Sequence, residues 1–145
     1  MIAADLMTEH PRTIRPDDTI GEAIEALQSM DVRHLPVVND DNELVGILSD
    51  RDLGSLFAPF AEGAEAEPTL VTRTERLVAT IMHADVVTAD AEADVADVIE
   101  AMLENKIGAI PVVDGERKLE GIISYVDILR TLGARESGLR ALVAD

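Results

Sequence analysis

The chain of 145 residues contains no cysteine, which excludes disulfides, thiolate metal sites and cysteine nucleophiles. Histidine is also rare, because only His10, His34 and His83 occur and no two have the i, i+4 spacing of a helical metal pair. No apolar run approaches the roughly 20 residues that cross a bilayer, and the first residues lack the order of a secretion signal. We therefore expect a soluble, cytoplasmic protein.

Basic residues are the other scarcity, with 12 against 29 acidic ones and a formal net charge of −17. Nucleic acids and anionic membranes are bound through lysine and arginine side chains that neutralise phosphates, so we expect neither as a partner. One explanation of the acid excess is a salt-loving organism, in which ions screen the repulsion between carboxylates. The other is a surface built for a basic partner. We favour the halophilic origin.

The sequence contains an internal repeat with a constant offset, seen where Leu35-Pro36-Val37-Val38 returns as Ile110-Pro111-Val112-Val113, 75 residues later. The same offset aligns Met7 with Met82, Thr13 with Thr88, Ile24-Glu25-Ala26 with Ile99-Glu100-Ala101, Gly46-Ile47 with Gly121-Ile122, Ser49 with Ser124 and Asp52 with Asp127. Chance rarely holds one register over such a span. We predict one repeat at residues 1–58, an acidic linker at 59–75, a second repeat at 76–133 and a C-terminal tail at 134–145.

Each repeat predicts the element order β-α-β-β-α, an α/β (α+β) fold in which helices cover one face of a small mixed sheet. The first strand is expected near residues 12–15 and 86–88, and helices with one apolar stripe follow Thr19 and Asp94, both good N-caps. Two strands and a turn come next. Ser49 and Ser124 then begin the second helices, which end near Phe57 and Gly133. Gly46 and Gly121 predict a bulge or a place where a strand passes a ligand.

Two units with a Pro-Val-Val strand and a closing Gly-Ile-x-Ser-x-x-Asp resemble a tandem pair of CBS domains, also called a Bateman module. The resemblance covers almost the whole chain apart from the linker and the tail. It implies two repeats related by a pseudo-two-fold axis, with clefts between them that take adenosine-containing ligands. It also implies a homodimer. No catalytic constellation is recognisable, so we expect a regulatory module and not an enzyme.

The resemblance implies a role for each residue of the motif. In the family the aspartate holds the ribose hydroxyls and the serine reaches phosphate, roles that fall on Asp52 and Ser49 and on Asp127 and Ser124. The positions expected near the adenine are Thr13, Ile14, Leu35, Thr88, Ala89 and Ile110. The chemistry is suitable, because a carboxylate can accept two hydroxyls in a fork and a serine at a helix start lies beside exposed N–H groups.

The same residues also have a purely structural interpretation. Ser-x-x-Asp is an N-cap with an acidic first-turn residue, which stabilises a helix by about 1 kcal/mol without any ligand. Capping and binding are compatible. Arg33 and Arg51 occur in the first repeat only, so we expect its cleft to prefer nucleotides and the second to be weaker or to take adenosine-like groups. The alternative is that both arginines pair with acidic neighbours, and His34 is expected to be a packed or solvent-facing side chain.

The sequence therefore predicts a module that binds AMP, ADP or ATP, needs no cofactor or metal, and uses occupancy to bias its own conformation or that of an unidentified regulated protein. One alternative is another adenosyl ligand, S-adenosylmethionine or NAD. The other is a dimerisation scaffold with empty clefts, in which the motif serves only as a helix cap.

Overall fold

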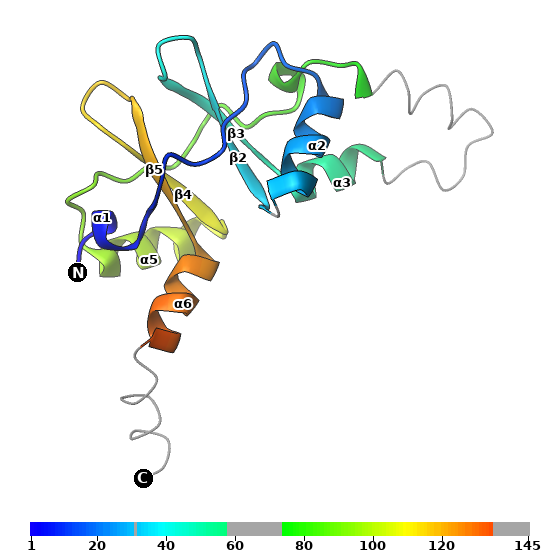
Figure 1. Ribbon diagram of the computed structural model, residues 1–145. Coiled ribbons are helices and arrows are strands. Elements are labelled where there is room, and N and C mark those ends of the chain that lie inside the picture. The colour runs from blue at the N-terminus through cyan, green and yellow to red at the C-terminus, as the bar shows by residue number, and fades with distance from the viewer. Residues whose placement is uncertain (31, 58–73, 135–145) are drawn as a thin grey trace. The chain divides into compact units, whose positions relative to one another are not determined.

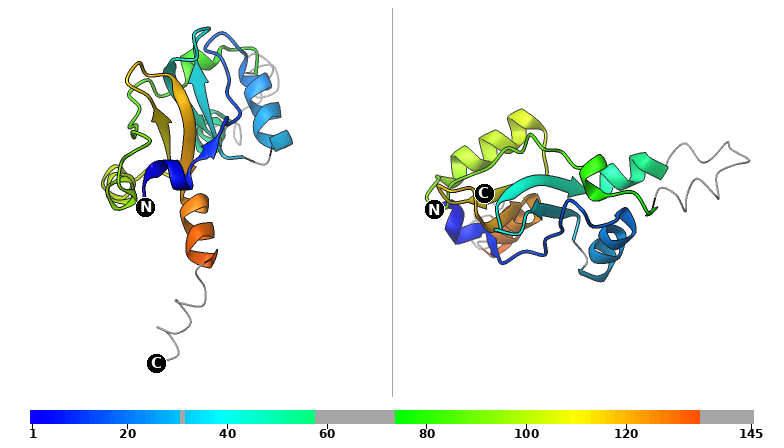
Figure 2. Two further views of the ribbon diagram at one scale, coloured as in Figure 1. Left: turned by 60° about the vertical axis from the view of Figure 1, so that its left-hand side comes forward. Right: turned by 90° about the horizontal axis from the view of Figure 1, so that it is seen from above.

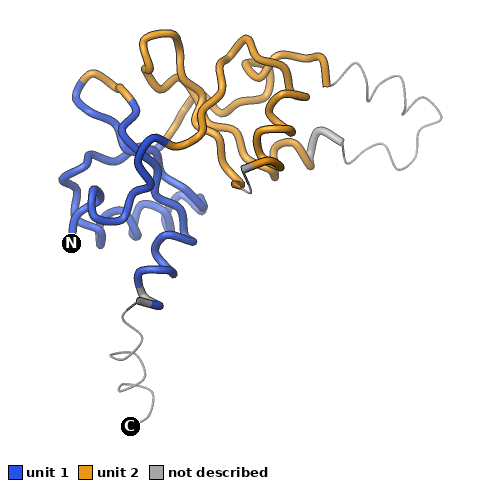
Figure 3. Tube along the Cα trace, in the orientation of Figure 1, with its two compact units in different colours: residues 1–10, 87–115, 119–145 blue, residues 11–86, 116–118 orange. Residues whose placement is uncertain are grey.

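The computed structural model describes residues 1–30, 32–57 and 74–134 of the chain. Most of the expected linker and nearly all of the expected tail lie outside these ranges. The chain divides into two compact units: unit 1 comprises residues 1–10, 87–115 and 119–145, and unit 2 comprises residues 11–86 and 116–118 (Figure 3). Within the described ranges, no helix is long and apolar enough to span a membrane.

Unit 2 is built on an antiparallel hairpin and two helices (Figure 1). Its elements are α2 (Ile20–Met30), β2 (His34–Val38), β3 (Leu44–Ser49), α3 (Asp50–Phe57) and the 3-10 turn η2 (Val78–Thr80). The expected capping box opens α2, since the Thr19 N–H donates to Glu22 Oε2 at 3.2 Å and the Glu22 N–H donates to Thr19 Oγ1 at 3.2 Å. The apolar stripe of α2 lies in the core of this unit, around the fully buried Ile20 and Ala23.

Unit 1 has a three-stranded antiparallel sheet in the order β1-β5-β4. Its elements are α1 (Ala3–Leu6), β1 (Thr8–Glu9), α5 (Val95–Asn105), β4 (Ala109–Val113), β5 (Leu119–Ser124) and α6 (Tyr125–Ala134). Asp94 caps α5, because its side chain accepts the Ala96 N–H at 2.8 Å. Helix α5 contacts β4, while α1 and α6 contact β5 (Figure 2).

The structure corrects the expected first strand of each repeat. Only one isolated parallel bridge forms there, from Ile14 to Val37 in unit 2 and from Ala89 to Val112 in unit 1. All pairings between named strands are antiparallel, and the isolated bridges add one parallel contact beside each hairpin. Ser49 and Ser124 also end strands, and each helix begins at the following residue.

The compact units do not coincide with the sequence repeats, because the segment at the start of each repeat packs with the strands of the other. Ala3 and Leu6 are buried in the core of unit 1, and Val78 is buried in the core of unit 2. Backbone hydrogen bonds fix both segments in the same way: the Ala3 N–H donates to Ala93 O and the Val78 N–H to Asp18 O, each at 2.8 Å. Each core is thus completed by residues that the repeat boundaries assign to the other copy.

Gly46 and Gly121 are needed where these segments cross the hairpins. A Cβ on Gly46 would lie 2.7 Å from Met82 Sδ, and a Cβ on Gly121 would lie 2.7 Å from Met7 Sδ. The register of each hairpin also shifts beside these glycines, which confirms the expected bulge. Part of the requirement for glycine is therefore internal, since the strand passes another segment of its own unit.

Candidate functional site

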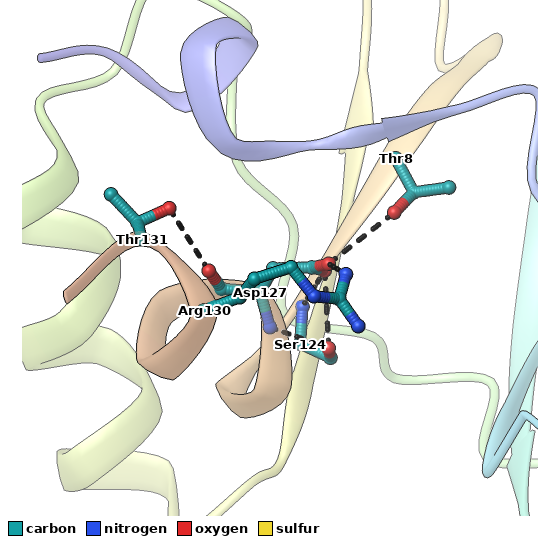
Figure 4. A network of polar contacts seen from close by, with 5 residues as sticks. All are labelled: Thr8, Ser124, Asp127, Arg130 and Thr131. Atoms are coloured by element: carbon teal, nitrogen blue, oxygen red, sulfur yellow. Dashed lines mark hydrogen bonds and ion pairs between the residues drawn. The ribbon is translucent and has the colours of Figure 1, made fainter. Parts of the chain in front are cut away.

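The Ser-x-x-Asp motif lies where the last strand of each unit becomes a helix, and both copies have the same geometry. In unit 2 the Ser49 N–H and Oγ–H donate to Asp52 Oδ2 at 2.8 and 2.9 Å, and the Asp52 N–H donates to Ser49 Oγ at 3.2 Å. In unit 1 the equivalent bonds of Ser124 and Asp127 measure 2.8, 3.1 and 3.2 Å (Figure 4). The capping interpretation of the motif is therefore confirmed in both copies.

This cap leaves one carboxylate oxygen for other partners. Oδ2 of each aspartate accepts two donors from its serine, which is the usual capacity of a carboxylate oxygen. The serine hydroxyl has one proton, and that proton already points to the aspartate. A ligand hydroxyl would therefore meet Oδ1 alone, and the fork with both oxygens turned outward is not the arrangement that the structure holds.

The partners of Oδ1 come from the segments that complete each unit and were not among the residues predicted from the sequence. Asp52 Oδ1 contacts His83 Nε2 at 2.8 Å. Asp127 Oδ1 accepts a longer bond of 3.4 Å from Thr8 Oγ1 and lies 3.6 Å from Arg130 Nη1 (Figure 4). The repeat itself carried the signal that could have found two of them, since the constant offset aligns Thr8 with His83 directly after the paired methionines.

The backbone holds Thr8 and His83 at matching positions. His83 and Ile47 exchange two backbone hydrogen bonds of 2.9 Å, and Thr8 in β1 is paired with Ile122 in β5. Ile47 and Ile122 are themselves related by the repeat. Each motif aspartate is mostly buried, with 17% of the side chain exposed at Asp52 and 11% at Asp127. The two sites therefore share a frame and differ in the side chain opposite the carboxylate.

Arg33 and Arg51 both lie near the start of α3. The Arg33 carbonyl accepts the Asp50 N–H at 2.9 Å, Arg51 is in the first turn, and both residues are exposed. Ion pairs within the described ranges include those of Arg15 with Asp40, His83 with Asp52 and Arg130 with Asp127, and none of these involves Arg33 or Arg51. Neither Arg33 nor Arg51 is thus occupied by an acidic neighbour within the described part of the chain.

His34 lies across the hairpin from Ser49 and is half-buried. Burial lowers the pKa of His34 below its usual value of 6.5, although the nearby carboxylates of Asp50 and Asp52 act in the opposite direction. This environment favours the neutral imidazole. His34 is a packed side chain, one of the two states expected for it.

The positions expected near the adenine have different accessibilities. Leu35 and Ile110 are 0% and 1% exposed, so their side chains belong to the cores and only their backbone could meet a ligand. The Ile14 and Ala89 N–H groups donate to Pro36 O and Pro111 O, at 3.1 and 3.0 Å. Thr13 and Thr88 are half-buried. Within the described ranges, no three His, Asp or Glu side chains are grouped to hold a metal ion.

Comparisons with known proteins match this architecture. The model of the CBS domain matches residues 3–57 and 78–134. Inosine-5'-monophosphate dehydrogenase of Methanocaldococcus jannaschii is 34% identical over 136 residues, which span 91% of this chain but only 24% of that enzyme. The chain likewise spans about a quarter to a third of the other curated relatives first matched.

Two solved structures are covered almost completely. The chain is similar to CBSX2 in complex with AMP, with a TM-score of 0.78, 26% identity and coverage of 93% of this chain and 98% of the other. It is also similar to the CBS domain pair of protein MJ0100 in complex with 5'-methylthioadenosine and S-adenosyl-L-methionine, with a TM-score of 0.76, 27% identity and coverage of 93% and 98%. Both structures contain adenosine compounds.

Proposed function

The chain belongs to the CBS-domain family, and from this premise we propose that it is a regulatory, non-catalytic module that binds an adenosine-containing ligand. The observation that carries the proposal is the pair of motif aspartates. Each has one oxygen fixed in a helix cap and the other next to a polar side chain, His83 or Thr8. The adenosine compounds bound by the two similar CBS structures support the same ligand class.

Within this class we propose AMP, ADP or ATP as the ligand. Asp52 Oδ1 and Asp127 Oδ1 accept ribose hydroxyls, and the exposed Arg33 and Arg51 favour a phosphate at the first motif. Arg130 places a cation at the second motif as well, which reduces the difference expected between the two. S-adenosylmethionine or NAD is the alternative within the adenosyl class.

Regulation follows from differential affinity. A ligand biases the conformation of this module, or of a protein that it controls, only by the difference between its affinities for the two states. We propose that the module acts as a homodimer, which sedimentation equilibrium would test directly.

Titration calorimetry in high salt with AMP, ATP, NAD and S-adenosylmethionine tests the proposal. Asp52→Asn and Asp127→Asn each remove a charged acceptor, so affinity at that motif should fall about 10- to 100-fold. Matched controls are Glu22→Gln and Asp5→Asn. Each likewise replaces by an amide a carboxylate that accepts the backbone N–H of the residue three positions earlier. These controls should bind normally.

Two results would contradict the proposal. If none of the four compounds produced heat, the scaffold with empty clefts would be the better description. If a compound bound but both aspartate variants retained full affinity, the assignment of the ribose to these carboxylates would be wrong.

A further inference from the structure

Resting on the proposed function, we propose that Thr8 and His83 are specificity-determining residues that set how strongly each motif distinguishes ribose from deoxyribose. The two residues occupy the same place in the repeat and come from the segments that complete each unit. His83 makes the motif of unit 2 tolerant of a missing ribose hydroxyl. Thr8 makes the motif of unit 1 selective for the complete ribose.

Each motif carboxylate can accept about four hydrogen bonds. Asp52 already accepts two from Ser49 at Oδ2 and one from His83 at Oδ1. One position therefore remains for a ligand. The contact of 2.8 Å has the length of a strong charge-assisted bond, which is about twice as strong as a neutral one.

The Oδ1 atom of Asp127 is less occupied. The Thr8 hydroxyl is 3.4 Å away, longer than the usual 2.5–3.0 Å of an O–H···O bond. The Arg130 guanidinium is 3.6 Å away, beyond the length of a hydrogen bond, so it fixes no acceptor position. In unit 1 one acceptor position of Oδ1 is therefore open, and the other holds only the long bond from Thr8.

The two motifs therefore differ in the hydrogen bond that a second ligand hydroxyl must displace. A second ribose hydroxyl at Asp52 must displace His83, so one good hydrogen bond is lost for each one gained. At Asp127 the second hydroxyl displaces only a long bond to Thr8, so most of its contribution is retained. Only one ribose hydroxyl should therefore add to the affinity at Asp52, whereas both should add to the affinity at Asp127.

The test compares AMP with 2'-deoxy-AMP and 3'-deoxy-AMP by calorimetry, using Asp127→Asn to isolate the first motif and Asp52→Asn to isolate the second. We expect each deoxy compound to bind about five- to tenfold more weakly than AMP at the second motif, and less than about twofold more weakly at the first. His83→Thr should raise the ratio at the first motif to about fivefold, and Thr8→His should lower the ratio at the second.

His83→Gln is the matched control, since its Nε2 can still donate to Asp52 and the low ratio should persist. Unchanged ratios in both exchange variants, with AMP still bound, would overturn this inference and leave the proposed function intact. Absence of AMP binding by the unsubstituted protein would overturn this inference, and absence of heat with all four adenosine compounds would overturn the proposed function as well. The ratio of affinities is informative because a general loss of protein stability would weaken the binding of all three compounds equally.

Discussion

The two units share one backbone arrangement around the motif aspartate but place different side chains opposite it. In both, a crossing segment pairs with the last strand, a methionine passes over a glycine, and the next residue faces the motif aspartate. That residue is His83 in unit 2 and Thr8 in unit 1. The comparison shows that the duplicated backbone frame was retained while the chemistry at the carboxylate changed.

The helices that follow the motifs differ in a similar way. Helix α6 exposes Tyr125, Val126 and Leu129, at 40%, 40% and 59%. The matching positions in α3 are Asp50, Arg51 and Gly54, all exposed. The caps at the start of these two helices are nevertheless the same. The residues that cap these helices are the same in both units, whereas the exposed residues on the helices differ.

The first segment of each repeat packs with the strands of the other repeat, and we call these two the exchanged segments. Removing a buried side chain from one of them should have the largest effect. Leu6→Ala removes a buried side chain from unit 1 and should lower the free energy of unfolding by about 2–4 kcal/mol. Val78→Ala should cost unit 2 less, because fewer methyl groups are lost. Amide hydrogen exchange would show lost protection in β4 and β5 for Leu6→Ala, and in β2 and β3 for Val78→Ala. Ile2→Ala, at an exposed position, is the control. The opposite pattern of protection would contradict the assignment of Leu6 to the core of unit 1 and of Val78 to the core of unit 2.

The crossing glycines should give the next effect. Gly121→Ala places a Cβ 2.8 Å from the Thr8 carbonyl oxygen, whereas Gly46→Ala places it 3.1 Å from the His83 oxygen. We expect both to destabilise by about 1–3 kcal/mol, with Gly121→Ala the more severe. Gly54→Ala, at an open position within a helix, should instead stabilise by up to about 1 kcal/mol. Urea unfolding measures all three, and equal costs for the two crossing glycines would contradict the ranking.

Salt should affect the two units together. Because the net charge is −17, screening reduces repulsion in the folded state, and 2 M KCl should raise Tm by about 4 °C or more relative to 0.1 M. Differential scanning calorimetry checks this expectation. A decrease in Tm would count against the halophilic explanation of the composition.

The smallest effect concerns His34, whose counterpart in unit 1 is Ala109. Burial lowers the pKa of His34, so between pH 6.5 and that lowered value the unfolded chain binds more protons than the folded one. The stability contributed by the neutral imidazole is complete above pH 6.5 and is lost as the pH falls. His34→Ala should reduce this dependence of the unfolding free energy on pH, as measured by urea unfolding at several pH values. An unchanged slope would show that His34 is not its source.

Local patterns predicted much of the fold. The apolar stripe beginning at Ile20 and the caps Thr19 and Asp94 depend on residues three or four apart, so the sequence reveals them directly. The exchange of segments could not be predicted in this way. Ala3 has the same apolar character whichever unit it packs in, and nothing near it in the sequence specifies the strands that bury it.

The candidate site was predicted in its residues but not in its hydrogen bonds. The repeated motif identified Ser49, Asp52, Ser124 and Asp127. The sequence did not show that the serines occupy one oxygen of each carboxylate, because capping and ligand binding use the same residue types. Nor did it place Thr8 opposite Asp127, since the two are 119 positions apart and meet only through pairing of β1 with β5.

The exchanged segments have a consequence for synthesis on the ribosome. The strands and helices of unit 2 emerge early, but their core is incomplete until Val78 has left the exit tunnel. Ala3 and Leu6, by contrast, are made long before β4 and β5 and must wait for them. Cutting the gene between the repeats would therefore give two fragments that each lack a buried piece, and the pieces would be restored only when the fragments are made together.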